Sequence, residues 1–364
     1  MRMKKMRVGV VGCGAISDIY LSNMIHTFDN LEVVACCARH FEHAKKKAEQ
    51  YGIEARTYEE ILSDPSIEMV VILTPAPTHE GLIRQALEAG KHVYTEKTMT
   101  LSAESAASLL ALAKEKNLRI GAAPDTFLGA ALQTARKAID DGLIGEVTSF
   151  EACANRNIDW LASMFHFLRM EGGGIGYDFG VYYLTALVSL FGPVERLAAS
   201  VRNLAKTRTN QVEGSPEYGQ MYEYDNESQI FSILEMKNGV RGTFSLNGDS
   251  VINDQALFTI YGKKGVLKLP DPNCFGGDVF YISAASGFDD HIEPQRLDYG
   301  FAYQENSRGI GPSDMAAAIC EGREHRASGE MAYHVLDVIE QIMNSGKQGA
   351  FVQISSKCQR PKPL

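Results

Sequence analysis

The feature that most constrains this chain is a regular alternation of short apolar runs and helical patterns through its first 122 residues. Apolar runs lie at residues 8–11, 31–37, 69–73, 91–95 and 118–122. Helical patterns separate them: one begins near Ala15, one spans 41–50, one ends at Gly90 and one spans 102–116. Strands that alternate with helices in this way predict a parallel sheet joined by right-handed crossovers.

The pattern changes beyond Pro124. A helical segment at 126–140 is followed by strand-like stretches at 147–154, 194–201, 228–236, 240–246, 256–261 and 266–269. A Lys237-Asn238-Gly239 turn joins two of them as a hairpin. This half therefore predicts an α+β domain with a large, mostly antiparallel sheet. A last helix carries apolar residues at helical spacing, and we expect Gly346 to end it: Met331, Val335, Val338, Ile339 and Ile342.

Length and charge narrow the class of protein. A chain of 364 residues predicts two domains, and we place them at 1–124 and 125–364. The net charge of −9 argues against a nucleic-acid partner, which needs a basic face. No apolar run is long enough to cross a bilayer, and the seven cysteines have no metal-ligand spacing. We therefore expect a cytoplasmic protein without a bound metal.

A glycine turn lies between the first apolar run and the first helix. Gly12 and Gly14, followed by Ala15, Ile16 and Ser17, fit the dinucleotide fingerprint G-x-G-x-x-G/A with a small third residue. One glycine makes the tight turn, and the next lets the backbone approach a pyrophosphate at the helix N-terminus. The sequence predicts that 1–124 is a dinucleotide-binding Rossmann domain.

The end of the second apolar run bears on which nicotinamide cofactor binds. An acid there would bond the ribose 2′-hydroxyl of NAD, but the chain has Ala38-Arg39-His40. The guanidinium of Arg39 suits a 2′-phosphate, which favours NADP. If Arg39 only stacks on adenine, it serves NAD equally.

Several motifs together resemble a known family. They are Gly12-x-Gly14, Thr74-Pro75 with His79, Gly90 to Glu96-Lys97, Gly172-Gly173-Gly174, and Asp178-Phe179-Gly180-Val181-Tyr182. In this order they resemble the glucose–fructose oxidoreductase, inositol dehydrogenase and rhizopine-catabolism family (Gfo/Idh/MocA) over nearly the whole chain. The resemblance implies an NAD(P)-dependent oxidoreductase acting on the hydroxyl-bearing carbon of a sugar, glycoside or cyclitol.

The resemblance also implies site residues. Thr74, Pro75, His79, Glu96 and Lys97 would belong to the cofactor site, and Lys97 would be catalytic. A lysine after a buried strand lies at the carboxyl edge of the sheet, where ligands bind, and its ammonium stabilises charge on a reacting oxygen.

Asp178 and Tyr182 complete the implied catalytic set. On a helix, residues four apart share one face. Most family members carry His where this chain has Tyr182, and the glucose–fructose oxidoreductase and dihydrodiol dehydrogenase branches look similar in carrying Tyr. A lysine cation favours the ionised phenol, so Tyr182 would exchange a proton with the substrate. Asp178 would orient a substrate hydroxyl.

Four further polar or aromatic residues are candidates for substrate contact: Asp125, Arg156, Trp160 and His166. Thr98 departs from the family's usual Glu-Lys-Pro. Two alternatives therefore stay open, a dinucleotide-binding sensor that has lost its chemistry and a sugar enzyme that uses a tightly held cofactor transiently. The second-half sheet resembles the family's oligomer surface, which implies a homodimer or homotetramer.

Overall fold

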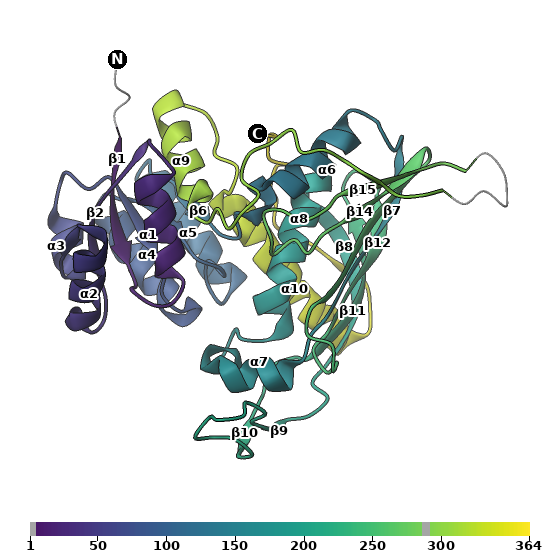
Figure 1. Ribbon diagram of the computed structural model, residues 1–364, viewed down its shortest axis with the longest axis horizontal. Helices are drawn as coiled ribbons and strands as arrows, with labels where there is room; N and C mark the ends of the chain where they lie inside the picture. The colour runs from purple at the N-terminus through teal and green to yellow at the C-terminus, as the bar shows by residue number, and fades with distance from the viewer. Residues whose placement is uncertain (1–4, 286–291) are drawn as a thin grey trace. The chain divides into compact units, whose positions relative to one another are not determined.

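The computed structural model describes residues 5–285 and 292–364. They pack into two compact units (Figure 1). Unit 1 holds the chain up to Leu128 together with Asn306–Tyr333, and unit 2 holds Gly129–Glu305 and His334–Leu364. Residues 306–333, which the sequence analysis assigned to the second domain, thus pack with the first unit.

Unit 1 is built on a six-stranded parallel sheet in the order β3-β2-β1-β4-β5-β6. Its strands are β1 (Met6–Val11), β2 (Leu31–Cys37), β3 (Glu54–Ala55), β4 (Met69–Ile72), β5 (His92–Thr95) and β6 (Ile120–Ala122). Its helices are α1 (Ser17–His26), α2 (Phe41–Tyr51), α3 (Tyr58–Ser63), α4 (His79–Glu88), α5 (Ala103–Glu115) and α9 (Ile310–Glu321), with short turns η1 (Ala76–Thr78) and η2 (Thr126–Leu128).

The central strands explain why the alternation of strands and helices could be recognised in the sequence. All four residues of β4 are apolar and buried, as in a parallel sheet covered on both faces. The predicted parallel Rossmann domain is confirmed. The short elements β3 and α3 were missed, although Thr57 and Glu60 form a capping box at the start of α3, a signature readable in sequence.

Unit 2 is built on a nine-stranded sheet in the order β16-β15-β14-β13-β7-β12-β11-β8-β17. Its pairs are antiparallel except for β7 with β12, so the expected, mostly antiparallel sheet is confirmed as a mixed one. The long strands are β7 (Val147–Asn155), β8 (Val194–Arg202), β11 (Gln229–Met236), β12 (Arg241–Asn247), β13 (Gln255–Gly262) and β14 (Gly265–Leu269). The short ones are β15 (Phe280–Ser283), β16 (Gln295–Arg296) and β17 (Val352–Gln353), and β9 (Thr207–Thr209) pairs separately with β10 (Met221–Glu223).

Helices lie along one face of this sheet, as Figure 1 shows for α6, α8 and α10. The helices that belong to unit 2 or continue into it are α6 (Ala130–Asp140), α7 (Ile158–Met164), α8 (Val181–Phe191) and α10 (Gly329–Gln348), with turns η3 (His166–Arg169) and η4 (Gly176–Gly180). Every residue of α8 is buried, which makes it the central helix of the unit.

The helices differ from the sequence-based expectation at two glycines, and both glycines are closely packed. Gly346 does not end the last helix, which continues to Gln348; a Cβ atom at Gly346 would lie 3.0 Å from Val201 of β8. The helix expected at 126–140 is interrupted at Gly129, where a Cβ atom would overlap the backbone of Phe275.

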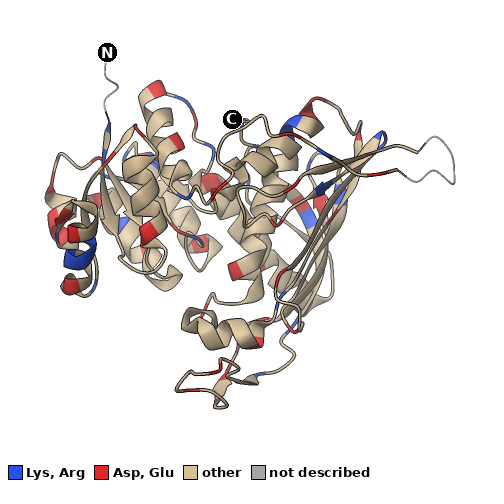
Figure 2. Ribbon diagram, viewed as in Figure 1, with Lys and Arg blue, Asp and Glu red and all other residues tan. Residues whose placement is uncertain are grey.

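Basic and acidic residues are not separated into distinct stretches of the chain. Lys and Arg residues are interspersed with Asp and Glu along the described ribbon (Figure 2). Over the described part of the chain, none of the helices combines the length and the apolar character needed to cross a membrane.

Candidate functional site

The glycine turn after β1 is fixed by the neighbouring strands. Gly12 has φ +108°, a backbone conformation that favours glycine. Its N–H donates to the carbonyl oxygen of Cys37 at 2.9 Å. A Cβ atom at Gly12 would lie 2.9 Å from the carbonyl carbon of Leu73. Both backbone conformation and space therefore require glycine at this position.

The next part of the turn leaves open space at a helix N-terminus. A Cβ atom at Gly14 would have no protein atom within 4 Å, so the bare backbone faces room for a ligand. Ser17 is buried and its hydroxyl donates to the carbonyl oxygen of Gly14 at 2.6 Å. Ile16, the residue before α1, offers no side-chain hydrogen bond to the first N–H groups of the helix. The exposed Ala15 and the uncapped N–H groups suit a pyrophosphate.

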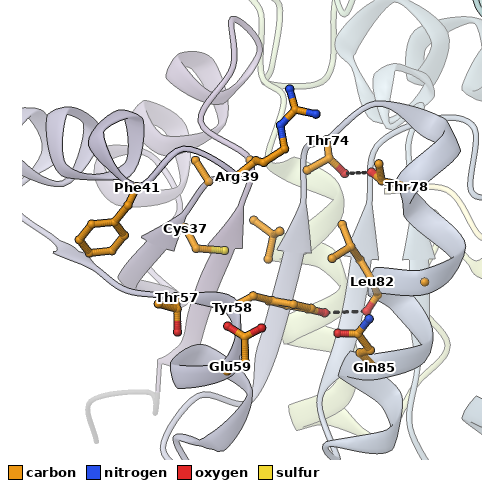
Figure 3. Close-up of a pocket in the computed structure, with 14 residues that line it drawn as sticks. Cys37, Arg39, Phe41, Thr57, Tyr58, Glu59, Thr74, Thr78, Leu82 and Gln85 are labelled. Atoms are coloured by element: carbon orange, nitrogen blue, oxygen red, sulfur yellow. Dashed lines mark hydrogen bonds between the residues drawn. The ribbon is translucent and has the colours of Figure 1, made fainter.

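A cavity of about 620 Å³ adjoins this turn within unit 1 (Figure 3). It is lined by residues at the carboxyl ends of β1, β2 and β4 and by residues of α3 and α4. Thr74 and Thr78 lie on one side, joined by a 2.7 Å hydrogen bond, and the Tyr58 hydroxyl donates to the Leu82 carbonyl oxygen at 2.6 Å. The crevice at the carboxyl ends of parallel strands is the place where this fold binds a dinucleotide.

The charges around the cavity bear on which cofactor fits. Arg39 lies two residues after the end of β2 and is exposed, with its guanidinium extending at one end of the cavity in Figure 3. Glu59 is the acid among the 14 lining residues, and it comes from α3, 20 positions further along the chain than Arg39. The position after β2 thus offers a cation where an NAD-selective site has a carboxylate.

The segment after β5 carries Lys97. Glu96 is almost fully buried, and its two carboxylate oxygens accept hydrogen bonds from the Tyr20 hydroxyl at 2.7 Å and from the Lys97 N–H at 3.0 Å. Tyr20 belongs to α1, so the helix that begins at the glycine turn also holds the backbone of Lys97. The Lys97 side chain itself is partly exposed, and the Lys97–Thr98 peptide bond is cis.

His79 is buried between the segments that follow β4 and β5, and its assignment to the cofactor site stays a prediction. Its ring is 0% exposed, and its two nitrogens lie 2.7 Å from the carbonyl oxygens of Thr98 and Thr74. Burial lowers the pKa of this histidine, against the opposing effect of its contacts with the two carbonyl oxygens. With no exposed surface, His79 joins the segments after β4 and β5 and does not line the cavity. Pro75 lies exposed beside Thr74.

Asp178 and Tyr182 lie on one continuous helical segment in unit 2. The glycine run is followed by the π-helical turn η4, which contains Asp178, and directly by α8, which contains Tyr182. Asp178 is partly buried and Tyr182 is 8% exposed. Lys97 belongs to unit 1, so its approach to these two residues stays a prediction.

The four candidates for substrate contact have different surroundings. Asp125 is 1% exposed and accepts hydrogen bonds from the N–H groups of Gly309 and Gly311 at the start of α9. Burial raises its pKa to about 6. Such a carboxylate stabilises a helix N-terminus, and its contacts are internal to unit 1.

Arg156 is also engaged within its own unit. It forms an ion pair with Asp271 and lies 5.0 Å above the ring of Phe179 in η4. Trp160 is partly buried in α7, and His166 is exposed, 3.5 Å from Glu217. Substrate contact by these residues stays a prediction.

Sequence reasoning missed several residues that line the cavity, namely Phe41, Thr57, Tyr58, Glu59, Thr78, Gly81, Leu82 and Gln85. The capping box would have pointed to the residues on α3. The residues on α4 follow soon after Thr74 in the sequence, and this closeness would have pointed to them. No group of three or more His, Cys, Asp or Glu residues suited to a metal ion exists among residues 5–285 and 292–364.

Comparison with protein families gives two matches that together cover most of the chain. Residues 6–123 match the model described as an oxidoreductase family with an NAD-binding Rossmann fold. Residues 132–268 match the GFO/IDH/MocA C-terminal domain.

Curated relatives and solved structures agree with these matches. Scyllo-inositol 2-dehydrogenase (NADP(+)) IolW of Bacillus subtilis is 24% identical over 357 residues, 95% of each chain. Trans-1,2-dihydrobenzene-1,2-diol dehydrogenase of Bos taurus is 26% identical over 273 residues, 73% of this chain and 75% of the relative. An uncharacterized oxidoreductase of Schizosaccharomyces pombe is 29% identical over 215 residues, 58% of each chain.

The fold is that of a levoglucosan dehydrogenase solved with NADH and L-sorbose. The two structures agree with a TM-score of 0.82 at 20% identity, covering 97% of this chain and 99% of the other.

Proposed function

Since this chain belongs to the Gfo/Idh/MocA family of NAD(P)-dependent oxidoreductases, we propose that it transfers a hydride between a nicotinamide and a hydroxyl-bearing carbon of a sugar, glycoside or cyclitol. The observation that carries the proposal is the cavity beside the glycine turn. Lys97 follows β5, which belongs to the same sheet as the strand that leads into this turn. The relatives that act on an inositol and on a dihydrodiol support this substrate class.

Unit 1 would bind the cofactor. Gly12 and Gly14 allow the pyrophosphate to approach the N-terminus of α1, while Thr74, next to Gly12, and Thr78 line the same cavity. The bound nicotinamide accepts or supplies the hydride. His79 and Glu96 hold the segments that carry Thr74 and Lys97.

Three side chains would handle the substrate. Tyr182 exchanges the hydroxyl proton, the Lys97 ammonium stabilises the charge that develops on that oxygen, and Asp178 orients the hydroxyl group. Arg156, Trp160 and His166 would contact the remainder of the substrate. This arrangement requires Lys97 of unit 1 to approach Asp178 and Tyr182 of unit 2.

The test is nicotinamide reduction by the purified protein with NADP⁺ or NAD⁺ and a panel of inositols, aldoses, levoglucosan and a trans-dihydrodiol. We expect Lys97→Ala and Tyr182→Phe each to lower kcat by about 100-fold or more. Lys45→Ala and Tyr218→Phe are matched controls at exposed positions and keep wild-type turnover. Full turnover by Lys97→Ala contradicts the assignment.

The same assay separates the alternatives. Tight NADPH binding without turnover of any polyol indicates a sensor. Nicotinamide that survives purification and does not exchange indicates transient use of a held cofactor. Among the two cofactors we propose NADP as the preferred one, because Arg39 follows β2 where an NAD site has an acid.

We also propose a homodimer or homotetramer formed through the large sheet. Phe231 of β11 and Leu257 of β13 are 51% and 49% exposed. Each lies in one cross-strand row with Ser245 and Cys153, and the row therefore shares one face. Exposed apolar side chains on a sheet face are typical of a protein interface.

The seven cysteines carry no disulfide, which supports a cytoplasmic location.

A further inference from the structure

The helical segment that carries Asp178 and Tyr182 begins against an acid from a distant part of unit 2. Glu227 lies 51 positions after Gly176, just before β11. Its carboxylate accepts a hydrogen bond from the Gly176 N–H at 2.8 Å, and the N–H of Tyr177 is a second donor. The backbone carbonyl oxygen of Glu227 accepts the N–H of Ile175 at 3.3 Å. One residue thus satisfies N–H groups that have no partner within the helix itself.

The same contact explains two of the glycines at the start of this helix, Gly174 and Gly176. A Cβ atom at Gly174 would overlap the carboxylate of Glu227, and one at Gly176 would lie 3.1 Å from its Oε1. At Gly173 a Cβ atom would overlap the backbone of Leu168. The bare backbone is therefore what allows the carboxylate to reach the first N–H groups.

We propose that Glu227 is a positioning residue that fixes the first turn of this helix and, through it, the placement of Asp178 and Tyr182. Asp178 lies one residue after the last N–H group that Glu227 holds, and its own N–H donates to the Gly174 carbonyl oxygen at 2.9 Å. The inference rests on the proposed function of Asp178 and Tyr182.

The surroundings of Glu227 make its charge sensitive to pH. Burial raises the pKa of its carboxyl to about 7, against the opposing effect of the backbone hydrogen bonds. The facing titratable groups are Tyr177 and Tyr224, and burial raises the pKa of both phenols far above neutrality. Beyond them, Arg208 lies 4.7 Å from the Tyr224 ring and is paired with two carboxylates, while Asp178 also interacts with Tyr224.

The ionised form of Glu227 holds the helix more firmly than the protonated form. A carboxylate makes the stronger hydrogen bond with an N–H group and complements the positive end of the helix. We therefore expect kcat to rise with pH around 7, with a contribution from Glu227 that disappears when this residue cannot ionise.

A first test measures the turn itself without relying on activity. Amide hydrogen exchange of residues 175–178 is compared in the wild type, Glu227→Ala, Glu227→Gln and the control Glu223→Gln, which changes an exposed acid of β10. We expect Glu227→Ala to lose about tenfold in protection, while Glu227→Gln, which keeps an acceptor oxygen, and the control lose about threefold or less. Unchanged protection in Glu227→Ala overturns the proposal.

A second test uses a substrate that the panel identifies. Glu227→Ala lowers kcat about tenfold or more with a smaller change in KM, and Glu227→Gln restores most of kcat but loses the rise near pH 7. An unchanged pH profile in Glu227→Gln contradicts the positioning role. If no substrate is turned over, the proposed function fails while the exchange measurement still decides on Glu227.

A third test asks whether Glu227 and Gly174 act through the same contact. Gly174→Ala places a methyl group on the Glu227 carboxylate and reproduces the exchange defect of Glu227→Ala. Because both changes break one contact, the double variant Gly174→Ala/Glu227→Ala is no less protected than the single ones. Additive losses overturn the assignment.

Discussion

The Tyr20 hydroxyl donates a 2.7 Å hydrogen bond to the carboxylate of Glu96, which also accepts the backbone N–H of Lys97. The helix that starts at the dinucleotide turn is thereby connected to the candidate catalytic lysine inside unit 1. Both side chains are buried, so the bond is protected from water.

Tyr20→Phe removes this donor and leaves a buried carboxylate oxygen without its partner. We expect the free energy of unfolding to fall by about 1–3 kcal/mol, measured by urea denaturation, and kcat to fall with it because Lys97 is less firmly held. Tyr51→Phe is the control, since its hydroxyl bonds the better-exposed Asp18 at 3.0 Å. Equal stability of the wild type and Tyr20→Phe would argue against the connection.

Two glycine substitutions in the same turn should have separable effects. Gly12→Ala strains a backbone with φ +108° and crowds Leu73, so it lowers both the Tm of the ligand-free protein and the affinity for NADPH. Gly14→Ala meets no protein atom within 4 Å, so it leaves the Tm unchanged but occupies the space needed by the pyrophosphate. NADPH fluorescence titration and thermal unfolding measure both. If Gly14→Ala binds NADPH with wild-type affinity, the dinucleotide does not bind at this turn.

Arg39 should decide between the two cofactors. Arg39→Ala removes a charge-assisted contact with the 2′-phosphate, which we expect to raise KM for NADP⁺ about tenfold or more and to change KM for NAD⁺ little. Lys46→Ala, an exposed cation of α2, serves as the control. Equal losses for both cofactors would mean that Arg39 contacts the shared adenosine part.

Acidification should destabilise unit 2 through His334. Its Nε2 accepts the Val194 N–H at 2.9 Å, and its Nδ1 lies 2.8 Å from the Ser356 hydroxyl oxygen. Burial lowers its pKa to about 4, below the ordinary value of about 6.5. As pH falls from 6.5 to 4, His334 becomes protonated in the unfolded chain but stays neutral in the folded chain. The stability that is present above pH 6.5 is therefore lost.

The expected loss is about 3 kcal/mol across that range. His334→Gln keeps an acceptor for Val194 but cannot titrate, so its stability falls less steeply with acid. Urea denaturation of both proteins between pH 7 and pH 4.5 measures the difference. Parallel curves for the two proteins would falsify this account of His334.

A charge on the open sheet face should break the proposed oligomer. Phe231→Glu places a carboxylate in the exposed apolar row that includes Leu257, and burying it against a second copy is unfavourable. We expect light scattering to report a smaller assembly than for the wild type. The control Glu223→Gln should form an assembly of the same mass as the wild type. If light scattering shows that the wild type is a monomer, the proposed oligomer is wrong.

The sequence alone determined the parallel sheet of unit 1 and the mostly antiparallel character of the sheet in unit 2, but not that residues 306–333 pack with unit 1. Apolar runs such as 69–73 and the glycine turn at Gly12 reflect local periodicity and backbone conformation, which a single segment contains. The long strands of unit 2 were predicted for the same reason. Two-residue strands such as Glu54–Ala55 were not, because they contain too few residues for a period.

Only the tertiary structure decided which distant groups meet. Glu227 reaches a helix 51 positions away, Asp125 holds the start of a helix 184 positions away, and His79 joins two segments that follow different strands. Such contacts depend on how strands are ordered and paired, which no local pattern encodes. A sequence can name a glycine run or a histidine beside a motif, but what the bare backbone or the ring contacts is decided when the chain folds back on itself.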